Sequence, residues 1–146
     1  MANKNEIVKL TDGVYQIKYY WLGIANVYAY LIVGSERALL IDTCYSITGI
    51  KKYVEQITTL PVDVVNTHGH FDHIGGNAEF ETIYLSKADR EVAGEHSDYN
   101  ALPKMIDNYE EKNVLVRYLF KLKKYKKQVE DSLHICLLYT SDAADD

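Results

Sequence analysis

Residues 67–76, Thr-His-Gly-His-Phe-Asp-His-Ile-Gly-Gly, constrain this chain more than any other segment. Within six consecutive positions they place three of the five histidines and one carboxylate, at His68, His70, Asp72 and His73. Imidazole nitrogens together with a carboxylate oxygen suit Zn²⁺, Fe²⁺ or Mn²⁺. A single histidine in a loop is usually solvated, but four possible ligands in six positions favour a metal-binding loop.

The flanking residues place this segment on a loop that follows a strand. Residues 62–66, Val-Asp-Val-Val-Asn, form a β-branched run introduced by Pro61, which indicates a short buried strand. Gly75 and Gly76 allow the backbone to turn tightly or to approach an ion closely. Sites in α/β sheets are commonly built on loops that leave the ends of strands. The segment therefore occupies a position typical of an active site.

The spacing of the four side chains indicates how they could divide between ions. His68 and His70 are one residue apart in extended backbone, so both can point to the same side and hold one ion. Asp72 and His73 follow where the loop turns, and adjacent side chains there can face a second point. Two ions a few ångströms apart would polarise a substrate oxygen and supply a bridging hydroxide at neutral pH.

The pattern His-Xaa-His-Xaa-Asp-His followed by Gly-Gly resembles the signature of the metallo-β-lactamase superfamily of metallohydrolases. Residues 39–43, Leu-Leu-Ile-Asp-Thr, resemble the family strand whose final aspartate supports the metal loop, although Cys44 stands where a glycine is usual. Residues 77–80 and 83–86 continue the resemblance, which covers roughly residues 7–95. It implies an α/β (α+β) fold, the N-terminal half of an αββα sandwich.

The resemblance also implies roles for individual residues. His68 and His70 would bind the first ion and Asp72 and His73 the second, both Zn²⁺, with iron or manganese as alternatives. A bridging hydroxide would be the nucleophile, and Asp72 would also guide a proton as the catalytic carboxylate. The reaction would be hydrolysis of an ester, thioester, lactone, amide or phosphodiester. Asp42 either supports a metal ligand by hydrogen bonding or caps the turn after its strand, and we favour the first role.

Two other functions stay open for this motif. One is non-haem iron redox chemistry on the same scaffold, and the other is a non-catalytic module that binds metal or a partner protein. The family's later ligands would lie beyond residue 135, so we expect the 146-residue chain itself to be inactive or nearly so and poorly soluble. His134 lacks the proline and glycine that flank the family's next ligand, so we do not assign it as one. We interpret His96 as a solvated loop histidine.

Composition indicates one ordinary globular domain. The chain is 47% hydrophobic and 25% charged, and its net charge of −5 gives no reason to expect nucleic acid or an anionic membrane as partner. No apolar run is long enough for a signal peptide or a membrane span, and two cysteines imply no disulfide framework. We therefore expect a cytoplasmic protein, and the resemblance implies a small-molecule substrate. Its oligomeric state is left open.

Hydrophobic patterning predicts two hairpins, followed by alternating helices and strands. The hairpins are expected over residues 7–19 and 27–42, with the second buried on both faces because it is almost continuously apolar. A helix is predicted over residues 46–57, and a strand over 82–85. Ser86 should cap a second helix that runs to Ala93.

The C-terminal third of the chain divides into two parts. Residues 102–122 fit one or two amphipathic helices. Residues 136–146, Cys-Leu-Leu-Tyr-Thr-Ser-Asp-Ala-Ala-Asp-Asp, resemble the conceptual translation of a transposon-based sequencing adapter. We therefore assign residues 1–135 to a partial metallo-β-lactamase-like domain and residues 136–146 to a non-native tail. The alternative is a genuine acidic tail, disordered by its composition.

Overall fold

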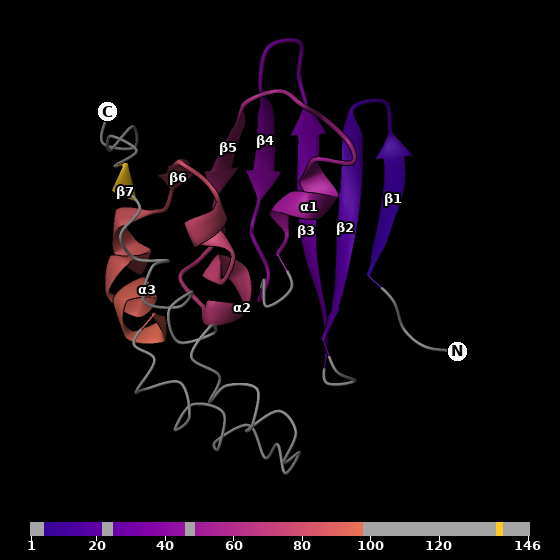
Figure 1. The fold of residues 1–146 in the computed structure, drawn as a ribbon. Helices are drawn as coiled ribbons and strands as arrows, with labels where there is room; N and C mark the ends of the chain where they lie inside the picture. The colour runs from indigo at the N-terminus through magenta and orange to yellow at the C-terminus, as the bar shows by residue number, and fades with distance from the viewer. Residues whose placement is uncertain (1–4, 22–24, 46–48, 98–136, 139–146) are drawn as a thin grey trace.

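The computed structural model describes residues 5–21, 25–45, 49–97 and 137–138. Within these residues, one sheet contains seven strands that lie side by side in the order of the sequence (Figure 1). The strands are β1 (Glu6–Thr11), β2 (Val14–Trp21), β3 (Ala25–Val33), β4 (Ala38–Ile41), β5 (Val62–Val65), β6 (Thr82–Tyr84) and β7 (Leu137–Leu138). Strands β1 to β4 are antiparallel, and β4 to β7 are parallel.

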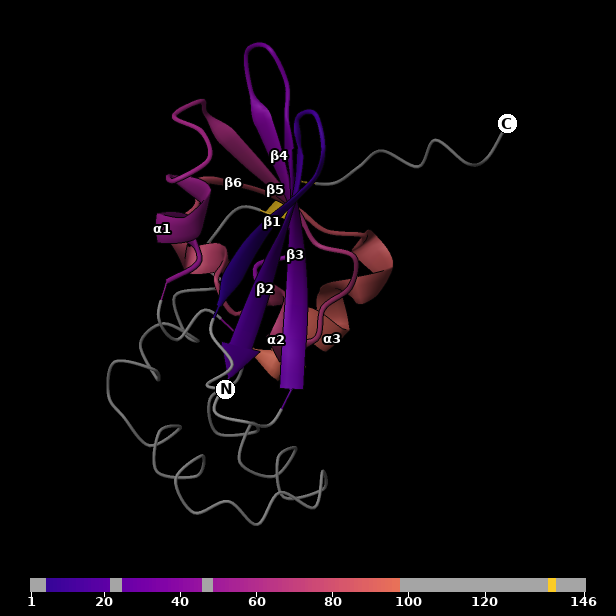
Figure 2. The same ribbon diagram turned by 90° about the vertical axis from the view of Figure 1, so that its right-hand side faces the viewer.

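Short helices connect the parallel strands. They are α1 (Lys51–Val54), α2 (Phe71–Ile74), α3 (Arg90–His96) and the 3₁₀ helices η1 (Asn77–Glu79) and η2 (Lys87–Asp89). Figure 2 shows α1 on one side of the sheet and α3 on the other. The described residues therefore form a mixed sheet with helices on both sides, which confirms the predicted α/β class. None of the described helices is long and apolar enough to cross a membrane.

The core lies between the sheet and α1. Four paired residues form a row across the sheet. Leu31 on β3 pairs with Leu40 on β4, and Leu40 pairs with Val64 on β5. Val64 in turn pairs with Ile83 on β6. All four side chains are at most 1% exposed, and Val54 of α1 belongs to the same buried cluster. This row forms because the side chains of a strand alternate between its two faces, and paired residues share a face.

Both predicted hairpins are confirmed. Strands β1 and β2 meet at a turn in which Gly13 has a φ of 73°, a backbone conformation that favours glycine. The expectation that the second hairpin is buried on both faces is wrong. Tyr28 and Ile32 of β3 are 38% and 40% exposed, while Ala29 and Leu31 between them are buried. The strand is apolar from Val27 to Val33, but α1 covers the opposite face of the sheet.

The open face of β3 leads to a prediction about solubility. Replacing Ile32 by threonine should reduce self-association, because it removes an exposed apolar group and keeps a β-branched residue in the strand. The cost in free energy of unfolding should be about 1 kcal/mol or less, since the side chain is only partly buried. Light scattering across a concentration series and urea unfolding would measure the two effects. An unchanged scattering profile would contradict this interpretation of the face.

The predicted helix over residues 46–57 is much shorter in the structure. Residues 46–48 lie outside the described ranges, and Gly49 has a φ of 83°, which is not helical. The helical hydrogen bonds therefore begin at Ile50 and end where the Thr58 N–H donates to the Val54 carbonyl. Apolar residues do recur at helical spacing in the sequence. The left-handed conformation of Gly49 and the turn after Val54 nevertheless confine the helix to α1.

The second predicted helix is confirmed and runs further than expected. The Ser86 hydroxyl accepts from the Ala88 N–H over 3.3 Å and caps η2. The chain then continues directly into α3, which ends at His96 rather than at Ala93. The polar residues near the end of α3 suggested a loop, yet its last turn is closed by hydrogen bonds from Ser97 to the Ala93 carbonyl.

Most of the C-terminal third lies outside the described residues. This includes the predicted amphipathic helices and His134. Two residues of the segment assigned to the tail are described: Leu137 and Leu138 form β7, beside Ile83 and Tyr84 of β6. The division into a domain and a tail stays a prediction.

Candidate metal centre

The predicted metal loop lies at the carboxyl ends of neighbouring parallel strands. It begins at Thr67, just after β5, and Asp42 directly follows β4. The two strands are paired, and the Asp42 N–H donates to the Val65 carbonyl over 2.9 Å. Parallel strands bring their carboxyl ends to the same edge of a sheet, which is where sites of α/β proteins are usually found. In Figure 1, α2 of the loop lies below the ends of β4 and β5.

The structure brings the four predicted ligands together. The ring centroids of His68 and His70 are 4.6 Å apart, and those of His68 and His73 are 3.9 Å apart. The Asp72 Oδ2 lies 3.6 Å from the His73 Nε2. His70 has extended backbone and precedes α2, whose single turn carries Asp72 and His73. The predicted change from extended to turning backbone is therefore present.

The gathered side chains do not form a finished coordination sphere. Within the described residues, no group of three or more histidine, cysteine, aspartate or glutamate side chains converges so as to hold a metal ion. The donor chemistry nevertheless fits a metal ion, because imidazole and carboxylate groups from one loop lie next to each other. Their assignment as ligands stays a prediction.

Asp42 is the buried partner that connects the loop to the sheet. Its side chain is 6% exposed, and its Oδ2 accepts from the His73 Nδ1 over 2.8 Å. The same carboxylate accepts from the Thr67 N–H and the Thr67 hydroxyl, both over 2.8 Å. Its backbone is left-handed, with a φ of 62°, which aspartate tolerates better than most residues. These contacts connect the loop to the end of β4, and the role of Asp42 in supporting a metal ligand stays a prediction.

The Asp42–His73 pair shifts the pKa of both groups. Burial by itself would raise the pKa of Asp42, but the hydrogen bonds from His73 and Thr67 outweigh burial and lower it. Burial would likewise lower the pKa of His73, but the bond to Asp42 and the charges of Asp72 and Asp42 raise it. The metal-free fold therefore favours a carboxylate beside an imidazolium.

These shifts predict how the stability of the metal-free chain depends on pH. The stabilisation from Asp42 is complete above its ordinary pKa of 3.8 and is lost as the pH falls through its lower native pKa. The stabilisation from His73 is complete below its ordinary pKa of 6.5 and is lost as the pH rises through its higher native pKa. The pair should therefore stabilise the fold most between about pH 4 and pH 6.5.

The matched measurement compares the chain with an Asp42→Asn variant in the presence of a chelator. The pKa values of His68 and His96 are lowered, chiefly by burial, and these shifts act in the opposite direction. The difference between the two chains in urea unfolding removes the part of that background that does not depend on Asp42. We expect this difference to peak inside the stated window and to shrink on either side. A difference that does not vary with pH would contradict the pairing.

A buried network of polar side chains holds the turn that follows the ligands. The His73 carbonyl accepts from the Thr43 N–H over 2.8 Å and from the Asn66 side-chain amide over 3.0 Å. The Asn77 amide donates to the Asn66 side-chain oxygen over 2.8 Å, and its own oxygen accepts from the Thr43 hydroxyl over 2.9 Å. Sequence reasoning missed Asn66 and Asn77. A polar residue directly after an apolar strand was the available signal for Asn66.

The glycines of the loop serve close backbone packing. A Cβ atom on Gly75 would lie 2.7 Å from the Tyr45 carbonyl oxygen and 2.8 Å from the Cys44 carbonyl oxygen. Gly75 has an ordinary φ of −61°. Neither a tight turn nor contact with an ion is therefore needed to explain why a glycine stands at this position. Cys44 has a left-handed φ of 54°, a conformation that favours glycine. This explains why the resembling family usually has a glycine at this position.

His96 is not the solvated loop histidine that the sequence suggested. It is the last residue of α3 and is half-buried. Its ring stacks on His70, with a centroid distance of 4.6 Å and an interplanar angle of 22°. The Phe71 N–H donates to its Nδ1 over 3.3 Å. No spacing rule links position 96 to the loop, because the packing of α3 creates the contact.

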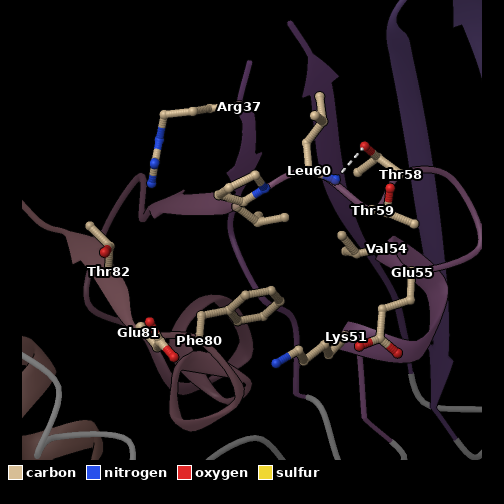
Figure 3. Close-up of a pocket in the computed structure, with 12 residues that line it drawn as sticks. Arg37, Lys51, Val54, Glu55, Thr58, Thr59, Leu60, Phe80, Glu81 and Thr82 are labelled. Carbon is tan, nitrogen blue, oxygen red and sulfur yellow. Dashed lines mark hydrogen bonds between the residues drawn. The ribbon is translucent and has the colours of Figure 1, made fainter. Parts of the chain in front are cut away.

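A pocket of about 580 Å³ lies away from the histidines, at the amino ends of β5 and β6 (Figure 3). Arg37 and Lys51 extend from opposite sides of it, and the ring of Phe80 lies between them. The Arg37 guanidinium also bonds both oxygens of Asp63, at 2.7 and 2.6 Å. Because the loop follows the carboxyl end of β5, this pocket is not part of the candidate metal centre.

Comparison with known proteins identifies the family. The family model for the metallo-beta-lactamase superfamily matches residues 22–96, which are 75 of the 146 residues. The chain belongs to the metallo-beta-lactamase superfamily. The matched range contains the whole candidate centre, from Asp42 to His96.

Curated and solved members of the superfamily resemble the chain over part of their length. The human protein named acyl-coenzyme A thioesterase MBLAC2 is 27% identical over 114 residues, which cover 68% of this chain and 40% of that protein. The Bos taurus protein of the same name is 26% identical, with the same coverage. The chain therefore spans about 40% of the length of the curated relatives that it matches.

Two solved structures show the likeness of fold. The metallo-beta-lactamase from Hirschia baltica superposes with a TM-score of 0.55 at 21% identity, covering 64% of this chain and 48% of that one. The metallo-beta-lactamase from Pontibacter korlensis gives a TM-score of 0.54 at 24% identity, covering 64% and 49%. The matched part of the chain thus has the fold of about half of a metallo-beta-lactamase.

Proposed function

We propose that this chain carries the metal loop of a zinc-dependent hydrolase. His68 and His70 are the ligands of one ion, and Asp72 and His73 are the ligands of a second. The observation that supports this most is the gathering of the loop, with ring centroids 3.9 to 4.6 Å apart, beside a buried carboxylate that already bonds His73. Zinc takes imidazole and carboxylate ligands, and iron or manganese can use the same donors.

The residues of the chain prepare the site in two ways. Asp42 accepts a hydrogen bond from the His73 Nδ1–H. This bond fixes the ring and leaves Nε2 as the nitrogen that would coordinate the ion. Asp72 is 31% exposed and can take up a proton at its carboxylate from the water that attacks the substrate. A bound zinc ion would act as a Lewis acid and lower the pKa of a bound water.

For the substrate we propose a small acyl thioester, within a wider range of esters, lactones, amides and phosphodiesters. The support is the family membership together with the relative whose name is acyl-coenzyme A thioesterase, at 27% identity. The net charge of −5 adds no reason to expect a nucleic acid substrate.

The test measures metal content and hydrolysis on the same preparations. Chain loaded with zinc should retain the metal, and a His68→Ala, His70→Ala double variant should lose it. A Ser35→Ala, Glu36→Ala double variant in the exposed β3–β4 turn is the control. We expect zinc-dependent cleavage of an acyl-coenzyme A by this chain to be barely detectable at most, because four donors divided between two ions leave both coordination spheres incomplete.

Other outcomes select the alternatives. Zinc retention without cleavage of any thioester, β-lactam or phosphodiester would favour a metal-binding module without turnover. Iron-dependent consumption of oxygen without hydrolysis would favour the redox function. A chain that retains no zinc, iron or manganese would overturn the proposal.

A further inference from the structure

Helix α3 meets the metal loop with one of its faces. Asp89 ends η2 and is the N-cap of α3. It lies four residues before Ala93, which lies three before His96, so the three residues are on the same side. The Asp89 Oδ1 accepts from the Gly69 N–H over 3.3 Å. A Cβ atom on Gly69 would be 2.6 Å from the Ala93 nitrogen, so the two backbones are in direct contact. Gly69 lies between two of the proposed ligands, and α3 packs directly on it.

His96 meets the same loop two residues further on. Its Nδ1 accepts from the Phe71 N–H over 3.3 Å, and its ring centroid lies 4.6 Å from that of His70 and 5.8 Å from that of Phe71. The ring of His70 therefore has His96 as a stacked neighbour and His68 as an edge-on neighbour. These contacts restrict both the side chain of His70 and the peptide bond that follows it.

We propose that His96, assisted by Asp89, is a positioning residue that holds His70 and the loop backbone in place for metal binding. The inference rests on the proposed metal-binding function of the loop. Its physical basis is that a ligand already fixed by neighbours loses less conformational freedom when it coordinates an ion. His96 acts through His70 and Phe71 in this role and is not itself a ligand.

Three variants test the role. His96→Ala removes both the stacked ring and the hydrogen-bond acceptor, and His96→Phe keeps a ring but removes the acceptor. Glu91→Ala is the matched control, because Glu91 is exposed on the same helix. Hydrogen exchange of the Phe71 amide, followed by NMR in the metal-free chain, reports the loop contact independently of any metal. Zinc affinity is measured by competition with a chelator.

The expected pattern differs between the variants. Phe71 should exchange faster in both His96 variants and at the normal rate in Glu91→Ala. Zinc binding should weaken by about tenfold or more in His96→Ala and by less in His96→Phe, which keeps the ring that stacks on His70.

Two results would overturn the proposal. One is unchanged Phe71 exchange in folded His96→Ala. The other is a loss of zinc in His96→Phe as complete as that in His70→Ala, which would make His96 a ligand. A chain that binds no zinc, yet shows faster Phe71 exchange in the variants, would instead refute the proposed function and leave the loop contact established.

Discussion

Replacing Asp42 by alanine should lower the free energy of unfolding of the metal-free chain by about 3 kcal/mol or more. The buried carboxylate accepts three hydrogen bonds, two from Thr67 and one from His73, and the substitution leaves all three donors without their partner. Alanine must also adopt the left-handed φ of 62°, which costs a residue with a Cβ about 1 kcal/mol. Zinc affinity should fall by about 10- to 100-fold, because His73 loses the group that orients it.

Asp42→Asn is the matched variant for this prediction. Asparagine keeps the shape and tolerates the left-handed backbone. Its effect therefore reports the loss of the charge and of the Oδ2 acceptor that serves both His73 and the Thr67 hydroxyl. We expect a destabilisation smaller than that of the alanine variant and a clear loss of zinc affinity. Urea unfolding followed by circular dichroism and chelator competition would measure both quantities. Two variants that each unfold within about 0.5 kcal/mol of the parent chain would refute a structural role for Asp42.

Replacing Gly75 by alanine should destabilise the chain by about 3 kcal/mol, at the upper end of the usual cost of overpacking. The added methyl group would lie 2.7, 2.8 and 2.9 Å from the carbonyl oxygens of Tyr45, Cys44 and Phe71. All three are backbone oxygens, and Phe71 lies in α2, so they move aside less easily than the end of a flexible side chain would. The segments after β4 and after β5 must therefore separate.

Gly94→Ala is the control that the chain itself offers. A Cβ atom at Gly94 would meet nothing within 4 Å, and the residue lies inside α3. Alanine there should stabilise the chain by about 0.5 to 1 kcal/mol, because glycine is the poorer helix former. Thermal unfolding of the two variants side by side should move the transition in opposite directions. A Gly75→Ala chain as stable as its parent would show that the two segments pack less closely than in the structure.

The strands could be predicted because their information is local. The hairpins over β1–β2 and β3–β4 follow from alternating or continuous apolar runs separated by turn residues, and β5 and β6 follow from short β-branched runs. The extent of the helices could not be predicted as well. The conformation of Gly49 limits α1, and the closing bonds of Ser97 extend α3, and both depend on how the chain is packed.

The sequence by itself determined which residue types lie on the candidate metal loop. Four potential ligands at fixed spacing after a strand, with Asp42 after the neighbouring strand, predict the position of the site and its donor chemistry. Such spacing is informative because residues within one loop stay close whatever the rest of the chain does. The family model matches residues 22–96, a range that includes this segment.

The resemblance predicted that Asp42 supports the loop, but only the tertiary structure decided that Asp42 bonds His73 and that His96 also contacts the loop. The bond between Asp42 and His73 joins residues 31 apart in the sequence, and the bond between Phe71 and His96 joins residues 25 apart. No periodicity connects such positions, because their distance depends on how β4, β5 and α3 pack against one another. The physical reason is that the sequence specifies donors and acceptors, while packing selects which of them meet.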